Sequence, residues 1–156
     1  MFKIPSRTSV FLSLALSVAL FCVCIFGAFF MPEIADMLVE AKNSMPYENI
    51  SEQGRTVLVI LGYLALCVIV LADALLFCLL LRVRNSKVFT AKSVALIRSI
   101  SWCCILLCLV LCGISVYFAL SLVVALAAAF LGLCVRVVKN VIEQATEIKS
   151  ENDLTV

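Results

Sequence analysis

Nine cysteines are the most reactive side chains in this sequence, and all of them lie within long apolar runs. They are Cys22, Cys24, Cys67, Cys78, Cys103, Cys104, Cys108, Cys112 and Cys134. Cys104, Cys108 and Cys112 would share one helix face, a spacing that suits a soft metal such as Cu(I). The chain has no histidine and no Cys-x-x-Cys pair, however, and a free cysteine packs as a small hydrophobic residue. We therefore interpret the cysteines as packing residues and expect no metal and no cofactor; a redox role is the alternative.

Asp73 is the only charged residue deep inside an apolar run. It lies eight residues before Leu81, which places it about 12 Å inside the cytoplasmic boundary of a membrane helix. An ionisable residue at that depth is costly and marks a functional site by default. We expect Asp73 to face the bundle interior and to pair with a residue of the third or fourth span. Arg136 is the preferred ion-pair partner because its long stem can reach inward, and Arg98 lies near the same face. A protonated Asp73 hydrogen-bonded to a serine is a second structural possibility, and transport of protons or cations is the functional alternative.

The composition requires a membrane around these residues. Of 156 residues, 65% are hydrophobic and only 14% are charged, and the mean hydropathy is +1.21. Soluble domains are about 45–50% apolar and about 25% charged. A soluble fold of this size could not bury the excess, so the sequence predicts an integral membrane protein and supplies no catalytic constellation of polar residues.

Four apolar segments are long enough to cross a bilayer, and they define a single membrane domain, residues 1–156. The first is too long, and too bulky at its end, for a cleaved signal peptide. The uncharged block 100–135 would form a helix of about 54 Å, so we divide it at a turn near 113–121. The predicted fold is all-α, a four-transmembrane-helix bundle. The expected spans are about 10–31, 57–81, 98–115 and 119–138, with an outer loop 32–55, an inner connector 82–97 and a C-terminal segment 139–156.

Basic residues are distributed unevenly between the two sides of these spans. Ten of the twelve fall before the first span, between the second and third, or after the fourth: Lys3, Arg7, Arg82, Arg84, Lys87, Lys92, Arg98, Arg136, Lys139 and Lys149. The loop 32–55 carries five acidic residues instead, Glu33, Asp36, Glu40, Glu48 and Glu52. By the positive-inside rule, we expect a multi-pass protein of the cell membrane with both termini in the cytoplasm.

Three shorter elements are expected outside the spans. Apolar residues at helical spacing after Pro32 (Ile34, Met37, Leu38 and Ala41) predict a short helix lying on the outer membrane surface. Thr90 is a suitable N-cap for the helix that enters the third span. After the fourth span, apolar and polar residues alternate at helical spacing, which predicts an amphipathic cytoplasmic helix in 139–156.

Small residues four positions apart predict close helix contacts in the first and fourth spans. The pairs are Ser13 and Ser17, Ala15 and Ala19, Ala125 and Ala129, and Ala128 and Gly132. This spacing allows helix backbones to approach in a membrane.

The Phe89-Thr90 element, the segment 132–138 and the terminal Glu151-Asn152-Asp153-Leu154-Thr155-Val156 carry a resemblance. The chain resembles a bacterial family of small four-span membrane proteins of unknown function. Members have a Phe-Thr element before the third span and a terminal Glu-x-Asp-Leu-Thr signature, and they are often encoded beside a Cro/repressor-type helix-turn-helix regulator. The resemblance implies the bacterial inner membrane and supplies no catalytic residue.

Two classes of function follow from these observations. The first is a non-enzymatic interaction or regulatory module that docks a cytoplasmic partner, a regulator protein in particular. Its candidate contact residues are Arg82, Arg84, Lys87, Phe89, Thr90, Lys92, Arg98, Asp153 and Leu154. The second is a small oligomeric transporter or channel subunit that uses Asp73. The expected partners are the lipid bilayer, this cytoplasmic protein and further copies of the chain, and no direct binding to nucleic acid is expected.

Overall fold

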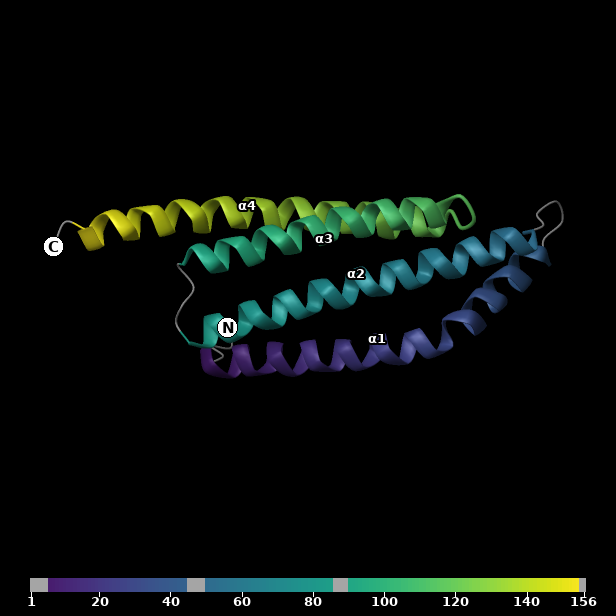
Figure 1. Cartoon of the computed structure of the whole chain (residues 1–156), viewed down its shortest axis with the longest axis horizontal. Helices are drawn as coiled ribbons and strands as arrows, with labels where there is room; N and C mark the ends of the chain where they lie inside the picture. Colours follow the sequence, from purple (N-terminus) through teal and green to yellow (C-terminus); the bar gives the residue numbers. More distant parts are fainter. Residues whose placement is uncertain (1–5, 45–49, 86–89, 155–156) are drawn as a thin grey trace, which may run out of the picture.

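The structure is a computed structural model that describes residues 6–44, 50–85 and 90–154. It contains four helices, α1 (Ser6–Asn43), α2 (Glu52–Arg84), α3 (Ala91–Ser115) and α4 (Leu120–Leu154), and the described residues include no strand (Figure 1). Each helix is long and apolar enough to cross a membrane. The predicted all-α fold, with four helices that are long and apolar enough to span a membrane, is therefore confirmed.

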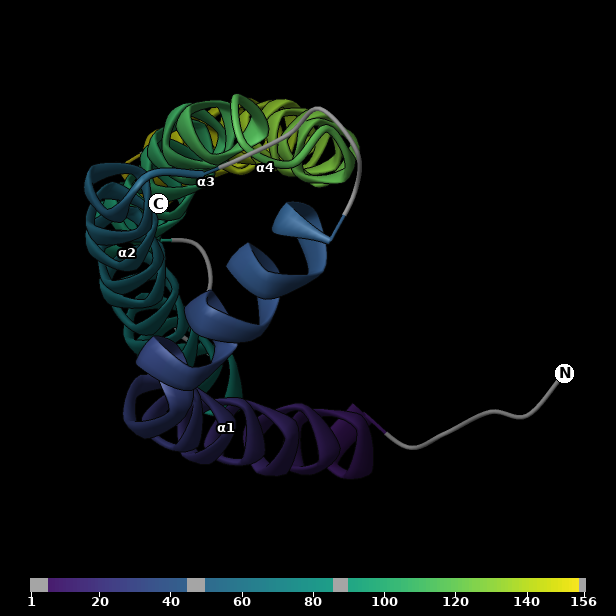
Figure 2. The ribbon, with the colours of Figure 1, turned by 90° about the vertical axis from the view of Figure 1, so that its right-hand side faces the viewer.

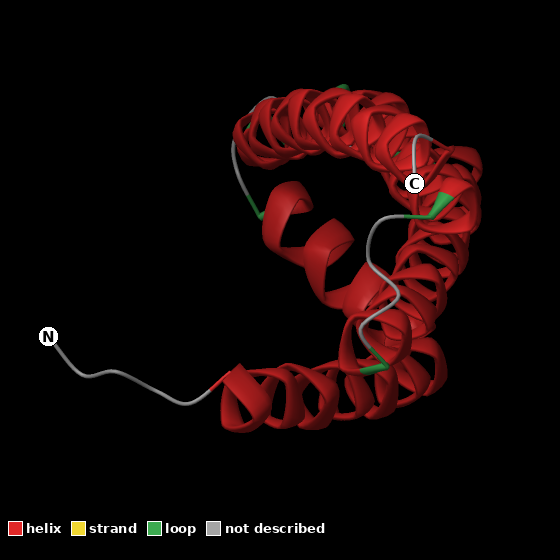
Figure 3. Ribbon diagram, turned by 90° about the vertical axis from the view of Figure 1, so that its left-hand side faces the viewer, coloured by secondary structure: helices red, strands yellow, loops and turns green. Residues whose placement is uncertain are grey.

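The four helices form an open bundle because each packs only against its neighbours in the sequence. α1 packs against α2, α2 against α3, and α3 against α4. No other pair of helices is in contact within the described ranges. Viewed along the helices, the arrangement is a C, with α1 and α4 as its two arms (Figures 2 and 3). α1 and α4 therefore leave most of their surface to lipid or to another protein.

The two ends of this bundle differ in the helix ends that they bring together. The start of α1, the end of α2, the start of α3 and the end of α4 lie at one end, which we call the connector end (Figure 1). The end of α1, the start of α2 and the α3–α4 turn (residues 116–119) lie at the other, which we call the loop end. Since the chain runs up and down in order, basic residues near the end of α2, the start of α3 and the second half of α4 gather at the connector end.

α1 differs from the prediction because it continues through Pro32 to Asn43. Residues 33–43 are thus not a separate surface helix, and α1 bends instead (Figure 1). A proline removes one backbone donor, which leaves the carbonyl four residues earlier, that of Ala28, without its helical partner. The Tyr63 hydroxyl of α2 donates to this Ala28 oxygen at 3.2 Å. A neighbouring helix thus replaces the lost hydrogen bond, which is how membrane helices tolerate proline.

This replacement leads to a prediction about Tyr63. Tyr63→Phe should lower the free energy of unfolding in detergent by about 1 kcal/mol, because the Ala28 carbonyl loses its donor in an apolar layer. In a Pro32→Ala background, the backbone N–H of residue 32 returns, so the same Tyr63→Phe change should cost much less. The measurement is a double-mutant cycle of thermal stability. Equal costs in the two backgrounds would show that Tyr63 does not compensate for Pro32.

α4 is one uninterrupted helix, so the helix expected after the fourth span is not a separate element. Residues 133–154 contain neither glycine nor proline, and alanine, glutamate, glutamine and lysine, all good helix formers, occur throughout its second half. Nothing in this sequence ends the helix at the membrane boundary, and α4 extends beyond the first turn of α3 at the connector end (Figure 1).

Small residues make the α3–α4 contact, as the spacing in α4 predicts. Ala125 is fully buried at 0% exposure, and Ala128 and Gly132 are also buried. The Ser101 hydroxyl of α3 donates to the Gly132 carbonyl at 2.9 Å. A Cβ atom on Gly132 would lie 3.0 Å from the Cβ of Cys104. In α1, by contrast, Ser17 is buried but Ala15 and Ala19 are exposed, so the predicted contact through these two alanines is wrong.

Candidate functional site

Asp73 is buried between α2 and α1, with 5% of its surface exposed. Its carboxylate accepts a hydrogen bond from the Ser17 hydroxyl of α1 at 2.7 Å, and this bond is buried. Asp73 therefore faces the interior, as its cost in lipid requires. The partner is a serine, the second of the two structural possibilities that the sequence leaves open, and it comes from the first span.

The predicted pairing of Asp73 with Arg136, or with another residue of the third or fourth span, is wrong. Arg136 belongs to α4, which does not contact α2. Its guanidinium lies instead over the Trp102 ring of α3, with 5.6 Å between the guanidinium carbon and the ring centroid. The reason is the order of the helices, because α3 lies between α4 and α2. A cation–π contact thus takes the place of the expected ion pair.

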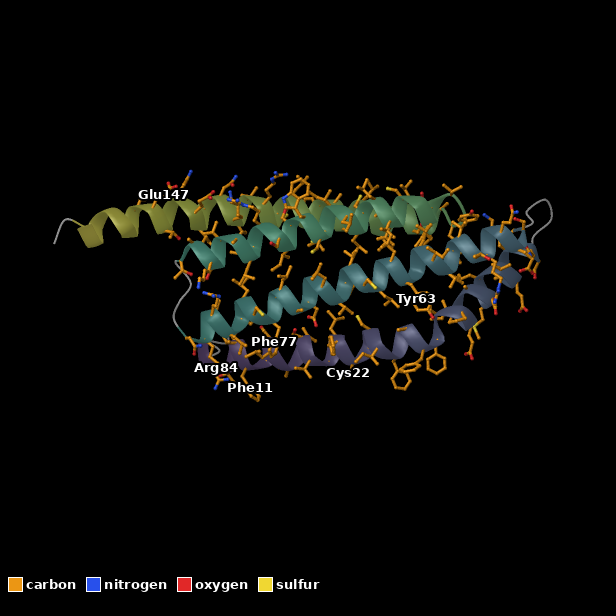
Figure 4. The ribbon with its side chains drawn as sticks, in the orientation of Figure 1. Phe11, Cys22, Tyr63, Phe77, Arg84 and Glu147 are labelled. Carbon is orange, nitrogen blue, oxygen red and sulfur yellow. The ribbon has the colours of Figure 1, made fainter. Side chains whose placement is uncertain are left out.

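Cys24 is a second buried residue of α1. It lies two turns after Ser17 and is likewise buried, whereas Cys22 is exposed (Figure 4). All nine cysteines have free thiols. Within the described ranges, no three histidine, cysteine, aspartate or glutamate side chains gather as a metal site would require. Cys104, Cys108 and Cys112 are half-buried on α3, and their interpretation as packing residues remains a prediction.

At the loop end, polar contacts join the bent half of α1 to the rest of the chain. Arg55 of α2 binds Asp36 of α1 through two guanidinium nitrogens, with 2.9 Å between Nη2 and Oδ2. Lys42 donates to the carbonyl of Tyr117 in the α3–α4 turn and lies 5.5 Å from the Phe118 ring centroid. Two residues of the acidic predicted loop thus bind α2 and the α3–α4 turn, and α1 reaches that turn without packing against α3 or α4.

At the connector end, Thr90 caps α3 as the sequence predicts. Its hydroxyl oxygen accepts the backbone N–H of Ser93 at 3.3 Å, and its backbone is extended, as is usual for an N-cap. Two of the other predicted contact residues, Lys87 and Phe89, lie outside the described residues. Asp153 and Leu154 belong to the last turn of α4.

The other basic residues near the ends of α2, α3 and α4 at the connector end differ in their surroundings. Arg98 of α3 forms an ion pair with Glu143 of α4 at 3.2 Å, and Lys139 binds the same carboxylate. This network holds α4 against α3 beyond the apolar spans. Arg82 and Lys92, in contrast, line a groove between α2 and α3 with a volume of about 570 Å³. Arg84 is exposed at the end of α2, outside this groove (Figure 4).

Comparison with known proteins identifies the family to which this chain belongs. Residues 3–156 match a family described as a protein of unknown function, DUF2975. The chain belongs to the DUF2975 family. No curated protein and no solved structure matches it significantly. For this DUF2975 chain, the roles of the site residues therefore have to be argued from their contacts and positions.

Three residues that matter in this DUF2975 chain are not evident from the sequence pattern. The spacing in the first span indicates that Ser17 is a small packing residue, although a hydroxyl in an apolar span is also a donor for a buried carboxylate. Tyr63 stands in an apolar run, and only the proline in the preceding span hints at its role. Glu143 lies four residues after Lys139, and this spacing predicts their contact but not the ion pair with Arg98.

Proposed function

We propose that this protein is a non-enzymatic membrane protein that docks a cytoplasmic partner at its connector end. The observation that carries the proposal is the extension of α4. Glu147 lines a groove together with Ala91 at the start of α3, so residues 148–154 continue α4 for about 10 Å beyond that level. A helix that projects past its own bundle is available to a second protein.

The exposed surface of α4 that leads into this extension supports binding through helix contacts. Val141 and Ile148 are seven residues apart on α4 and expose 59% and 63% of their surface. Glutamate, glutamine and lysine occupy the neighbouring positions of the helix. An amphipathic helix with apolar anchors at such spacing is a common recognition element for protein partners. We further propose that the partner is a regulator protein, a proposal supported by the resemblance of the chain to small membrane proteins encoded beside such regulators.

Partner docking in the cytoplasm depends on the orientation of the chain, which we infer from its charges. Arg82, Arg84 and Lys92 lie at the connector end, whereas the acidic segment lies at the loop end. Reporter fusions after Val156 and within 84–92 should report a cytoplasmic location, and a fusion at Ser44 should report an external one. A C-terminal fusion that behaves as external would overturn the orientation and the cytoplasmic docking site with it.

A photo-crosslinking amino acid placed on α4 tests the docking proposal directly. Incorporated at position 148 in the full chain in native membranes, it should give one discrete protein adduct that mass spectrometry identifies. The same amino acid at position 133, which is exposed within the apolar part of α4, is the matched control and should give lipid adducts. Adducts with lipid alone at both positions would contradict docking through the extension.

A second candidate function is that of a small transporter or channel subunit, and the burial of Asp73 within the spans favours it. α1 and α4 each pack against one helix only, so further copies of the chain could complete a pathway. In proteoliposomes, Asp73→Asn should then abolish proton or cation flux while lowering the free energy of unfolding by no more than about 1 kcal/mol. Unchanged flux in this variant would remove Asp73 from any transport role.

A further inference from the structure

We propose that the groove between the connector ends of α2 and α3 binds one anionic phospholipid, with its phosphate held between Arg82 and Lys92. This inference goes beyond the docking of a protein partner and does not depend on it. It also does not depend on which side of the membrane the connector end faces. It rests on the shape, the charge and the polarity gradient of the groove.

Two adjoining cavities make up this groove. One has a volume of about 570 Å³ and is lined by Leu81, Arg82, Asn85, Thr90, Ala91 and Lys92. The other, of about 470 Å³, is lined by Cys78, Leu81, Arg82, Lys92, Ala95, Leu96 and Ser99. Because they share Leu81, Arg82 and Lys92, the two cavities form one continuous groove. Each lies within the range of about 300–1,000 Å³ that is usual for ligand sites.

The charge of the groove calls for an anion. Among the described residues that line it, Arg82 and Lys92 are the only charged ones, and none is acidic. Neither makes an ion pair with any residue in the described part of the chain, whereas Arg98 and Lys139 nearby both bind Glu143. Two neighbouring cations with no acidic partner among the described residues repel each other, and a phosphate between them would remove this cost while accepting charge-assisted hydrogen bonds.

The polarity of the groove changes along its length as that of a phospholipid does. Asn85 and Thr90 lie at its outer part beyond the last apolar turn of α2, whereas Cys78 and Leu96 lie at its deeper part. Cys78 precedes Arg82 by one helical turn, which is about 6 Å along the axis. A headgroup phosphate at Arg82 would therefore place its acyl chains along apolar residues. Basic pockets between membrane helices are known to bind anionic headgroups in this way.

The competing anion is free phosphate, which shares the chemistry of the headgroup. Phosphate ions could meet the two cations, but they would make no use of the apolar wall formed by Cys78, Leu81 and Leu96. A zwitterionic lipid has the same apolar chains but no net charge. The groove has both two cations and an apolar wall. An anionic phospholipid, which offers a negative charge and acyl chains, should therefore bind more tightly than free phosphate or a zwitterionic lipid.

Native mass spectrometry of the delipidated full chain in detergent tests the proposal. The probes are dioleoyl phosphatidylglycerol, dioleoyl phosphatidylcholine and inorganic phosphate. One phosphatidylglycerol should bind saturably, and Arg82→Gln and Lys92→Gln should each weaken its binding about fivefold. Arg84→Gln removes a cation two residues away that does not line the groove, so binding should change by less than about twofold. Equal losses for all three variants would indicate diffuse surface charge and overturn the assignment.

A second pair of variants tests the apolar wall without changing any charge. Cys78→Trp should fill the deeper part of the groove and weaken phosphatidylglycerol binding. Cys67→Trp is the matched control, because Cys67 is also exposed on α2 but does not line either cavity, and it should leave binding unchanged. Equal binding by both tryptophan variants, equal affinity for phosphatidylcholine, or displacement of the lipid by inorganic phosphate would overturn the lipid site.

Discussion

Ser17→Ala should lower the free energy of unfolding by about 1–3 kcal/mol, because it leaves the Asp73 carboxylate buried without a donor. The Ser17 hydroxyl makes the only hydrogen bond that Asp73 has with the described residues. Asp73→Asn should cost about 1 kcal/mol or less, since its amide oxygen still accepts from Ser17. The measurement is thermal or denaturant unfolding of the purified protein in detergent.

Asp73→Leu distinguishes this contact from an ion pair. It leaves Ser17 without its acceptor, but a helical serine can donate to the carbonyl four residues earlier, as Ser13 does to Ser9 at 3.0 Å. The leucine variant should therefore be more stable than Ser17→Ala, whereas an ion-pair partner would be stranded by the same change. A leucine variant less stable than Ser17→Ala would point to a second, more costly partner for Asp73.

Gly132→Leu should lower the free energy of unfolding by about 1–3 kcal/mol or more, because it overfills the contact between α3 and α4. The Cβ atom alone would lie 3.0 Å from the Cβ of Cys104 and 3.5 Å from the carbonyl oxygen of Ser101. The larger side chain would therefore force the two helices apart and break the hydrogen bond from Ser101 to the backbone of residue 132. Thermal unfolding and expression in the membrane would both report this loss.

Gly27 provides the control for this prediction. A Cβ atom on Gly27 would lie 3.8 Å from the nearest atom, a methyl carbon of Leu66, which is an ordinary contact. Gly27→Ala should therefore be neutral or stabilising, because alanine favours the helix more than glycine does, whereas Gly132→Ala should be destabilising. If the two alanine variants had the same stability, α3 and α4 would not be in close contact at Gly132.

Hydropathy and local signals account for the parts of the fold that could be predicted from the sequence. The four apolar runs mark four helices, and Thr90 marks the start of α3. From the sequence alone, Pro32 suggests that the helix ends there. The structure shows a bend instead, because the Tyr63 hydroxyl of α2 replaces the lost hydrogen bond, and a local pattern in α1 does not reveal this partner. The amphipathic pattern after residue 138 suggests a new element, although nothing there breaks a helix and α4 runs on without interruption.

The partners of buried residues are harder to predict than the helices themselves. In a membrane, lipid is as apolar as a packing face, so hydropathy does not show which helices touch. From the sequence, Arg136 is a plausible partner for Asp73 because both lie near the same membrane boundary. In the structure, α3 lies between α4 and α2, and α1 packs against α2, so Ser17 rather than Arg136 reaches Asp73. Of the predicted contact residues at the connector end, Arg98 is engaged with Glu143, and the charge pattern alone does not distinguish it from Arg82.

The contact of each helix with only its neighbours in the sequence has a consequence for the synthesis of the protein. Packing partners emerge from the ribosome one after the other, so α1 can meet α2 before α3 and α4 exist. No helix needs to wait for a distant segment, which is the situation in which folding is fastest. Assembly can therefore follow translation hairpin by hairpin, and the membrane need never hold more than one unpaired helix of this chain.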